Sequence, residues 1–143
     1  MFSDTSIIDA STVQAYLETA YHVHAQPTFA LHIGEHSAAL ALLHNTHGVD
    51  CSAFITAWNP YSEATDAQEN AQHQQALVRS IQGMNLQALP GLGQHPSSQW
   101  PGEESFLLSG LDLPRARALG EQFGQNAIVW AGPDAVPNLV LLR

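Results

Sequence analysis

Short apolar runs, interrupted irregularly by helical patterns, constrain the fold of this chain more than any other feature. Seven runs of four to six residues have the length of strands and are bounded by turn residues. They are residues 29–33, 38–43, 53–57, 86–89, 105–108, 127–130 and 138–142. Because three helical patterns separate them without regular strand–helix–strand alternation, we predict an α+β fold. The expected order is α-βββ-α-ββ-α-ββ, with a mixed or antiparallel sheet.

Three segments place apolar side chains at helical spacing behind residues that cap helices well. Ser11 is the predicted N-cap of the first helix, and the capping-box sequence Thr65-Asp66-Ala67-Gln68 precedes the second. Asp112 is the predicted cap of the third, with a proline in its first turn. The helices are predicted over about 12–22, about 66–82 and between Asp112 and Gly124.

The first three predicted strands follow one another without a helix between them. Residues 29–33 and 38–43 flank the turn sequence Gly34-Glu35-His36-Ser37, which predicts a hairpin. Together with residues 53–57 they predict an antiparallel meander. After the strand at 86–89, the prolines and glycines of residues 90–102 predict a long loop.

The charge balance excludes two classes of partner. Four arginines and no lysine stand against thirteen carboxylates, so the formal net charge is −9. Nucleic-acid binding requires clustered basic side chains that neutralise phosphates, and an anionic membrane surface makes the same demand. We therefore expect neither a nucleic acid nor a membrane as a partner. A small molecule, a basic protein partner or a homodimer remains open.

Length and composition favour one soluble domain. The 143 residues can bury one ordinary core, and 45% of them are apolar. No apolar run approaches the roughly 18 residues that a membrane helix needs. Cys51 is the single cysteine, and the start of the chain has no secretory signal pattern. We expect a single domain over residues 1–143, with a structured core over 10–142, in the cytoplasm.

The first candidate site lies where the strand 53–57 runs into Trp58-Asn59-Pro60 and then into a helix. Free backbone N–H groups at a helix start can bind an anionic or carbonyl group. Trp58 offers a stacking face, and Asn59 can both donate and accept hydrogen bonds. The alternative is structural, with Asn59 forming only a turn, Ser62 only capping the helix and Trp58 lying in the core.

The second candidate is the pair Glu103-Glu104 at the start of a predicted strand. Because side chains alternate along a strand, one carboxylate faces inward if the other faces solvent. A buried carboxylate finds hydrogen-bond donors or takes up a proton. Glu104 is therefore a candidate general acid or base, or the partner of a ligand amine. The alternative is that both glutamates are solvated.

The third candidate, Gln125-Asn126, lies between the third predicted helix and the next strand. The two planar amides can hydrogen-bond the edge of a ligand, or they can satisfy backbone groups of the loop. No nucleophile in the chain has an evident base partner. This favours acid–base over covalent catalysis in any enzymatic interpretation.

Histidine is abundant, but its spacing predicts no metal site. Six of the eight histidines lie in one stretch, at His22, His24, His32, His36, His44 and His47. Zinc requires three or four converging ligands, and this spacing matches no zinc signature. The chain also lacks a P-loop. We therefore predict no metal and no cofactor.

Taken in order along the chain, the polar motifs resemble those of one protein family. They are Trp58-Asn59-Pro60 with Ser62, Asn70 in the following helix, Trp100 with Glu103-Glu104-Ser105, and Phe123-Gly124-Gln125-Asn126-Ala127. Over about residues 13–142 the chain is similar to the small bacterial proteins of domain-of-unknown-function family 3293. The resemblance implies a stand-alone single-domain protein whose motifs form one site. It implies no activity and no substrate.

These observations predict a pocket for a small polar ligand. We expect it to be built from Trp58, Asn59, Ser62, Asn70, Glu104 and Gln125, with Thr56 and Asn126 as second choices. Glu104 would bind a cationic group or move a proton, and is the predicted catalytic residue of any reaction there. The alternative is an acidic protein–protein interaction module without catalytic activity.

Overall fold

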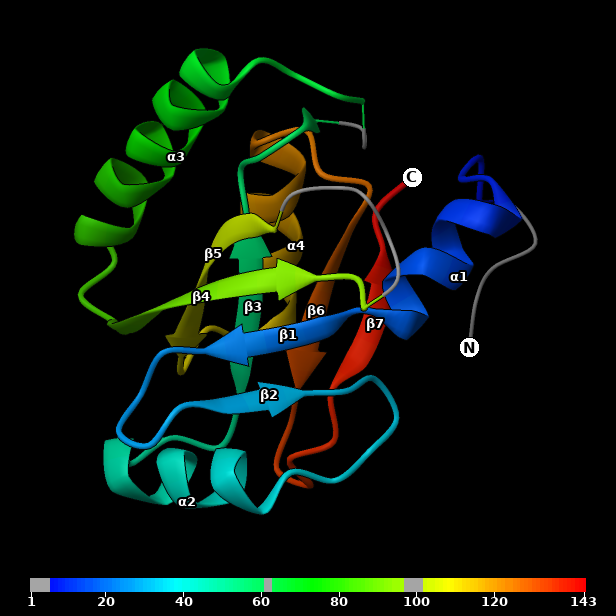
Figure 1. Cartoon of the computed structure of the whole chain (residues 1–143). Helices are drawn as coiled ribbons and strands as arrows, with labels where there is room; N and C mark the ends of the chain where they lie inside the picture. Colours follow the sequence, from blue (N-terminus) through cyan, green and yellow to red (C-terminus); the bar gives the residue numbers. More distant parts are fainter. Residues whose placement is uncertain (1–5, 61–62, 97–101) are drawn as a thin grey trace.

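A computed structural model describes residues 6–60, 63–96 and 102–143 of the chain, shown in Figure 1. These residues form the helices α1 (Ala10–Glu18), α2 (Ala38–His47), α3 (Ala67–Gln82) and α4 (Leu113–Gln122). They form the strands β1 (Ala20–Val23), β2 (Phe29–Leu31), β3 (Ser52–Thr56), β4 (Gln87–Gln94), β5 (Glu103–Ser109), β6 (Ala127–Ala131) and β7 (Asn138–Leu141). The strand order is β2-β1-β4-β5-β3-β6-β7, and all neighbouring pairs are antiparallel. The predicted α+β class is confirmed.

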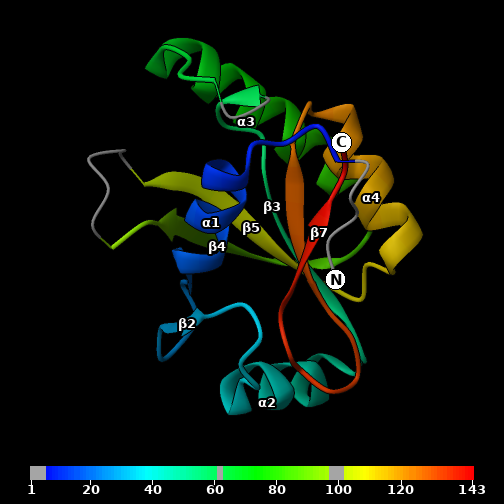
Figure 2. The same ribbon diagram turned by 90° about the vertical axis from the view of Figure 1, so that its right-hand side faces the viewer.

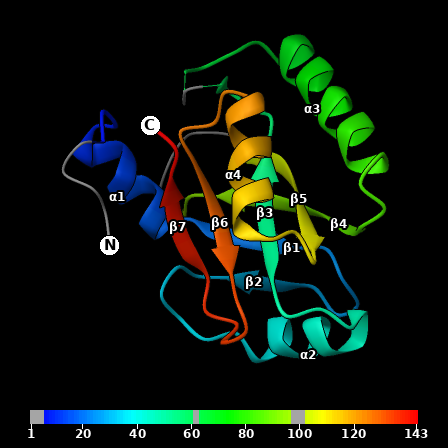
Figure 3. The same cartoon turned by 180° about the vertical axis from the view of Figure 1, so that it is seen from behind.

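The sheet is strongly curled, so that β1 and β2 run across the direction of β3, β6 and β7 (Figure 1). Side chains of β3 contribute to a hydrophobic core on each face. Ala53 and Ile55 pack with side chains of α3 and α4, and Figure 3 shows α4 over β3 and β6. Phe54 points to the opposite face, into a second core with β1, β2 and α2.

Residues 38–43, predicted as a strand, belong to α2, so the predicted hairpin and meander are wrong. This run contains only alanine and leucine, which favour a helix over a strand. Ser37 is the N-cap, and its Oγ accepts a hydrogen bond from the Leu40 N–H at 3.1 Å. Gly48, in the left-handed conformation at φ 68°, ends the helix. The predicted count of three helices is therefore one too low for the described residues.

The predicted first helix, about 12–22, is shorter than expected and starts earlier. α1 begins after Asp9, which makes no side-chain capping bond, so Ser11 is not the N-cap. The helix ends at Glu18, and residues 20–23 form β1 instead. β1 pairs with β2 on one side and with β4 on the other. β2 therefore pairs with β1, the strand before it in the chain, and not with residues 38–43 after it.

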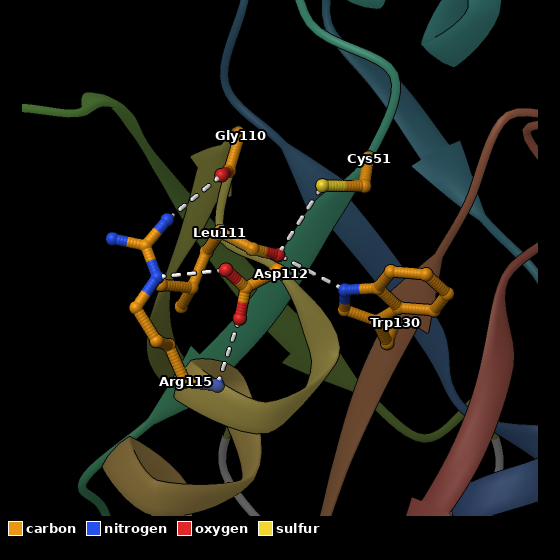
Figure 4. Close-up of polar contacts among 6 residues, drawn as sticks. All are labelled: Cys51, Gly110, Leu111, Asp112, Arg115 and Trp130. Atoms are coloured by element: carbon orange, nitrogen blue, oxygen red, sulfur yellow. Dashed lines mark hydrogen bonds and ion pairs between the residues drawn. The ribbon is translucent and has the colours of Figure 1, made fainter.

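The other two predicted helices are confirmed. Asp112 is the N-cap of α4, as predicted, whereas α3 is capped by Asp66 and not by Thr65, the first residue of the predicted capping box. Asp66 accepts a hydrogen bond from a backbone N–H in the first turn of α3 at 2.8 Å. Asp112 caps α4 in the same way at 3.0 Å. Figure 4 shows that the residue before this cap ties α4 to the sheet. The Leu111 carbonyl accepts from the indole N–H of Trp130 at 3.0 Å and from the thiol of Cys51 at 3.4 Å.

The segment 90–102, predicted as a loop, starts inside β4, which continues to Gln94. Gly91 and Gly93 pair with β1 on one side and with β5 on the other. The glycines that indicated a loop therefore lie where two neighbouring strands approach β4. This length of β4 brings Gly93, and His95 after it, to the cavity described next.

Candidate functional site

A cavity of about 390 Å³ lies between α1 and the curled sheet. Its lining comes from α1 and from β1, β3, β4, β5, β6 and β7, with contributions from the loops at one end. Figure 2 shows α1 and α4 on opposite sides of β6 and β7. None of the α1 residues is fully buried, so this helix closes the cavity without entering a core.

Much of the lining is apolar. Phe54, Val129 and Leu139 contribute side chains from β3, β6 and β7. The ring of Phe54 packs edge-on against Tyr21, with the ring centroids 5.3 Å apart. The Tyr21 hydroxyl donates to the Tyr16 carbonyl of α1 at 2.7 Å, and burial raises the pKa of Tyr21. This tyrosine therefore joins the wall of the cavity to the helix that covers it.

Asn59 forms the centre of the polar end of the cavity. Its backbone has φ 45°, a left-handed conformation that asparagine tolerates better than most residues. Its Oδ1 accepts from the Thr65 N–H at 3.0 Å and from Asn70 Nδ2 at 2.9 Å. Because these donors identify the oxygen, its Nδ2 is the atom that faces Glu103, and it donates to Oε2 at 2.7 Å.

Asn70 lies behind this group and holds it in position. It is a buried residue of α3, with only 2% of its surface exposed. Its Oδ1 accepts from the Asn59 N–H at 2.8 Å, while its Nδ2 donates to the Thr65 carbonyl at 3.1 Å. Both ends of the side chain are therefore satisfied inside the protein, and it does not line the cavity.

Glu103 brings a carboxylate into the cavity from the start of β5. Burial raises the pKa of this carboxyl, and the hydrogen bond from Asn59 lowers it by less. No ion pair is formed by Glu103 with any residue in the described ranges, and the lining contains no lysine or arginine. A partly buried carboxylate is thus held by one amide donor.

Gln125 reaches the same end of the cavity from the loop before β6. Its Nε2 donates to the Trp58 carbonyl at 3.1 Å and to the Phe123 carbonyl at 3.4 Å. Thr56 also lines the cavity, and its hydroxyl donates to the Glu104 carbonyl at 2.6 Å and accepts from the Trp58 N–H at 3.0 Å. These bonds hold the turn that carries Asn59.

The predicted site residues are only partly brought together. Asn59 and Gln125 line the cavity, as does the second choice Thr56, and Asn70 supports Asn59. Trp58 and Asn126 do not line it; the indole Nε1 of Trp58 is buried without a partner among the described residues. Asn126 is buried and accepts from Arg143 Nη1 at 3.1 Å. Ser62, like Trp100, falls outside the described residues.

The carboxylate in the cavity is that of Glu103 and not that of Glu104, the predicted residue. Glu104 is exposed and does not line the cavity. Glu103 shares a strand face with Ser105, which is buried and lines the cavity, because residues two apart point to the same side. The sequence shows that these two residues share a face, but it does not show which face of the strand meets the cavity. The contributions of α1, Tyr21 and His95 had no signal in the sequence.

Three histidines form hydrogen bonds with other side chains. His44 Nε2 lies 2.8 Å from Ser52 Oγ, His47 Nδ1 lies 2.7 Å from Ser109 Oγ, and His95 Nε2 lies 2.8 Å from Glu18 Oε1. Among residues 6–60, 63–96 and 102–143, no group of three or more histidine, cysteine, aspartate or glutamate side chains is placed to hold a metal ion. No helix in these ranges is long and apolar enough to cross a membrane.

Comparison with known proteins identifies a family. No curated protein and no solved structure matches the chain. One family model, described as "Protein of unknown function (DUF3293)", matches residues 55–128. The match covers 74 of the 143 residues, from β3 into β6, and includes Asn59, Asn70, Glu103 and Gln125. The chain therefore belongs to the DUF3293 family of proteins of unknown function.

Proposed function

We propose that this protein binds a small polar organic ligand in the cavity between α1 and the sheet. The observation that carries the proposal is the convergence of Asn59, Glu103 and Gln125 on one end of that cavity. They come from the loop after β3, the start of β5 and the loop before β6. A few polar groups converging on an apolar lining are typical of small-molecule sites, and about 390 Å³ is within their usual range.

Each polar residue has a distinct role in this proposal. Asn59 and Gln125 bind polar groups of the ligand, and Asn70 positions Asn59 through its two hydrogen bonds. Glu103 takes the role that the sequence analysis assigned to Glu104. Any proton transfer in the cavity would use Glu103, because it is the one carboxylate among the described lining residues.

The test fills the cavity and follows fragment binding. Ala15 of α1 lines the cavity, whereas Ala10 of the same helix is exposed. Ala15→Phe should therefore occupy the ligand's space, and Ala10→Phe adds the same ring outside it. A library of polar fragments is titrated into ¹⁵N-labelled wild type and both variants, and amide chemical shifts are recorded. We expect shifts of Asn59, Glu103 and Gln125 in the wild type and in Ala10→Phe, and their loss in Ala15→Phe.

Two results would contradict the proposal. One is that no fragment shifts the amides around the cavity. The other is that the shifts persist in Ala15→Phe at unchanged affinity, which would place binding elsewhere. Thermal unfolding of both variants is the control for folding, and a cooperative transition is required before the binding data are compared.

A further inference from the structure

We infer that the ligand of this cavity carries a cationic amine on an apolar body, and that the amine binds between Glu103 and Gln125. This inference rests on the function proposed above and specifies its ligand. It depends on which hydrogen-bonding atoms at the polar end of the cavity are already used by the protein.

Two acceptor atoms at that end have no donor among the described residues. Glu103 receives a hydrogen bond only at Oε2, from Asn59. Gln125 uses its NH₂ group for two backbone carbonyls, which identifies its other atom as the oxygen and leaves Oε1 without a donor. A ligand that completes this site must therefore bring N–H or O–H donors.

The two acceptor side chains form hydrogen bonds with adjacent residues, Trp58 and Asn59. Gln125 holds the carbonyl of Trp58, and the side chain of the next residue, Asn59, holds Glu103. Both residues line the cavity. An ammonium group has three donors and no acceptor, so one such group carries enough donors for both oxygens.

The charges of the lining select a cation over a neutral donor. Glu103 brings a carboxylate, and the described lining residues include neither lysine nor arginine. His95 also lines the cavity, and its Nε2 atom is 2.8 Å from Oε1 of Glu18. A charge partly shielded from solvent and without a counter-ion is unfavourable, and an ammonium group adds the attraction of opposite charges to its hydrogen bond with the carboxylate, which a neutral donor does not. A ligand cation would supply the missing charge.

The remainder of the lining determines the body of the ligand. Phe54, Val129 and Leu139 contribute apolar surface from three strands. An alkyl or aryl group attached to the amine would bury apolar area against these side chains, which adds to the affinity. The chemical class is therefore a primary alkylamine or arylalkylamine.

The experiment compares three probes of similar shape and different charge. The probes are 2-phenylethylamine, 2-phenylethanol and 3-phenylpropionate, titrated by NMR into the full chain at pH 7.5. We expect the amine to bind at least about tenfold more tightly than the alcohol. Glu103→Gln should abolish this preference while keeping the hydrogen bond from Asn59. Glu104→Gln removes the same charge from an exposed neighbour and should leave the preference unchanged.

The outcomes separate this inference from the proposed function. If the alcohol or the carboxylate binds in the cavity as tightly as the amine, or if Glu103→Gln keeps the amine preference, the amine inference is wrong and the cavity remains a binding site. If none of the probes, nor any library fragment, shifts the amides around the cavity, both proposals are overturned. If Glu104→Gln weakens amine binding as much as Glu103→Gln, the effect is long-range charge, and direct contact with Glu103 is refuted.

Discussion

Gly91 lies where two strands and an aromatic ring meet, and replacing it with alanine tests the packing beneath the cavity. A Cβ atom at this position would lie 2.5 Å from the His22 carbonyl oxygen and 2.8 Å from Cε2 of Phe54. Both distances are too short for nonbonded contact. The carbonyl cannot move away without disturbing the pairing of β1 with β4, and the Phe54 ring is packed against Tyr21.

The expected loss of stability follows from these contacts. Overpacking a well-packed site costs about 1–3 kcal/mol, and a clash with backbone belongs in the upper half of that range. The entropy of unfolding, about 2.1 cal/mol/K per residue, is roughly 0.3 kcal/mol/K for 143 residues. A loss of about 2–3 kcal/mol therefore lowers the melting temperature of Gly91→Ala by about 7–10 °C.

Gly93 provides a matched control in the same strand. A Cβ atom there would find its nearest neighbour, Cδ1 of Tyr21, at 3.8 Å, an ordinary contact. Gly93→Ala should therefore melt within about 2 °C of the wild type, because alanine also restricts the unfolded chain slightly. Calorimetric melts of both variants at one protein concentration measure the difference. Equal melting temperatures for the two variants would refute the steric reasoning.

Two further predictions concern Glu103 and the helix caps. Burial raises the pKa of Glu103, so the folded state binds the proton of this carboxyl more tightly than the unfolded state does. The stability that the bound proton contributes is therefore lost as pH rises through the raised pKa. Glu103→Gln should therefore melt above the wild type at pH 8, by a margin that disappears toward pH 4.5, while the exposed Glu104→Gln shows no such trend. Asp66→Ala should lower the melting temperature by about 3 °C, for a lost cap of about 1 kcal/mol. Asp9→Ala should cost less, since Asp9 makes no capping bond.

The helices predicted correctly are those whose local signals agree with their packing. α3 combines a capping aspartate, Asp66, with buried residues at helical spacing, Asn70, Gln74, Leu77 and Ile81. The predicted range of about 66–82 differs from the observed one by a single residue. Such signals lie within the segment itself, so one sequence is sufficient to read them.

The failures arise where the sequence pattern fits two structures. Residues 38–43 are continuously apolar and short, so periodicity does not distinguish a buried strand from a helix. The absence of β-branched residues and the cap at Ser37 decide for the helix. β1 is different, because it is stabilised by pairing with Gly91–Gln94, about 70 positions away in the chain. Such long-range pairing leaves no mark on the local pattern.

For a related reason, the sequence does not show which of Glu103 and Glu104 lines the cavity. β5 is a central strand, paired with β3 and β4, and apolar side chains point from both of its faces. Phe106, Leu107 and Leu108 follow one another without the apolar–polar alternation that would reveal which face a residue shares. The pairing of β5 with β3, in which Ser105 lies opposite Thr56, determines which of the two glutamates faces the cavity. This register depends on the tertiary structure and is not visible in the sequence.

The way in which Glu103 is held argues for binding over a purely structural role. A structural carboxylate in a protein interior is normally paired with a cation or saturated with donors, because a charge left incompletely satisfied is destabilising. Glu103 has one amide donor, and that donor, Asn59, is itself fixed by Asn70 and Thr65. One carboxylate oxygen is thus held by a fixed donor and the other has no donor among the described residues, which is the arrangement that the proposed ligand site requires. Stability and binding should consequently change in opposite directions at this position: the substitution that raises the melting temperature is the one that abolishes amine selectivity.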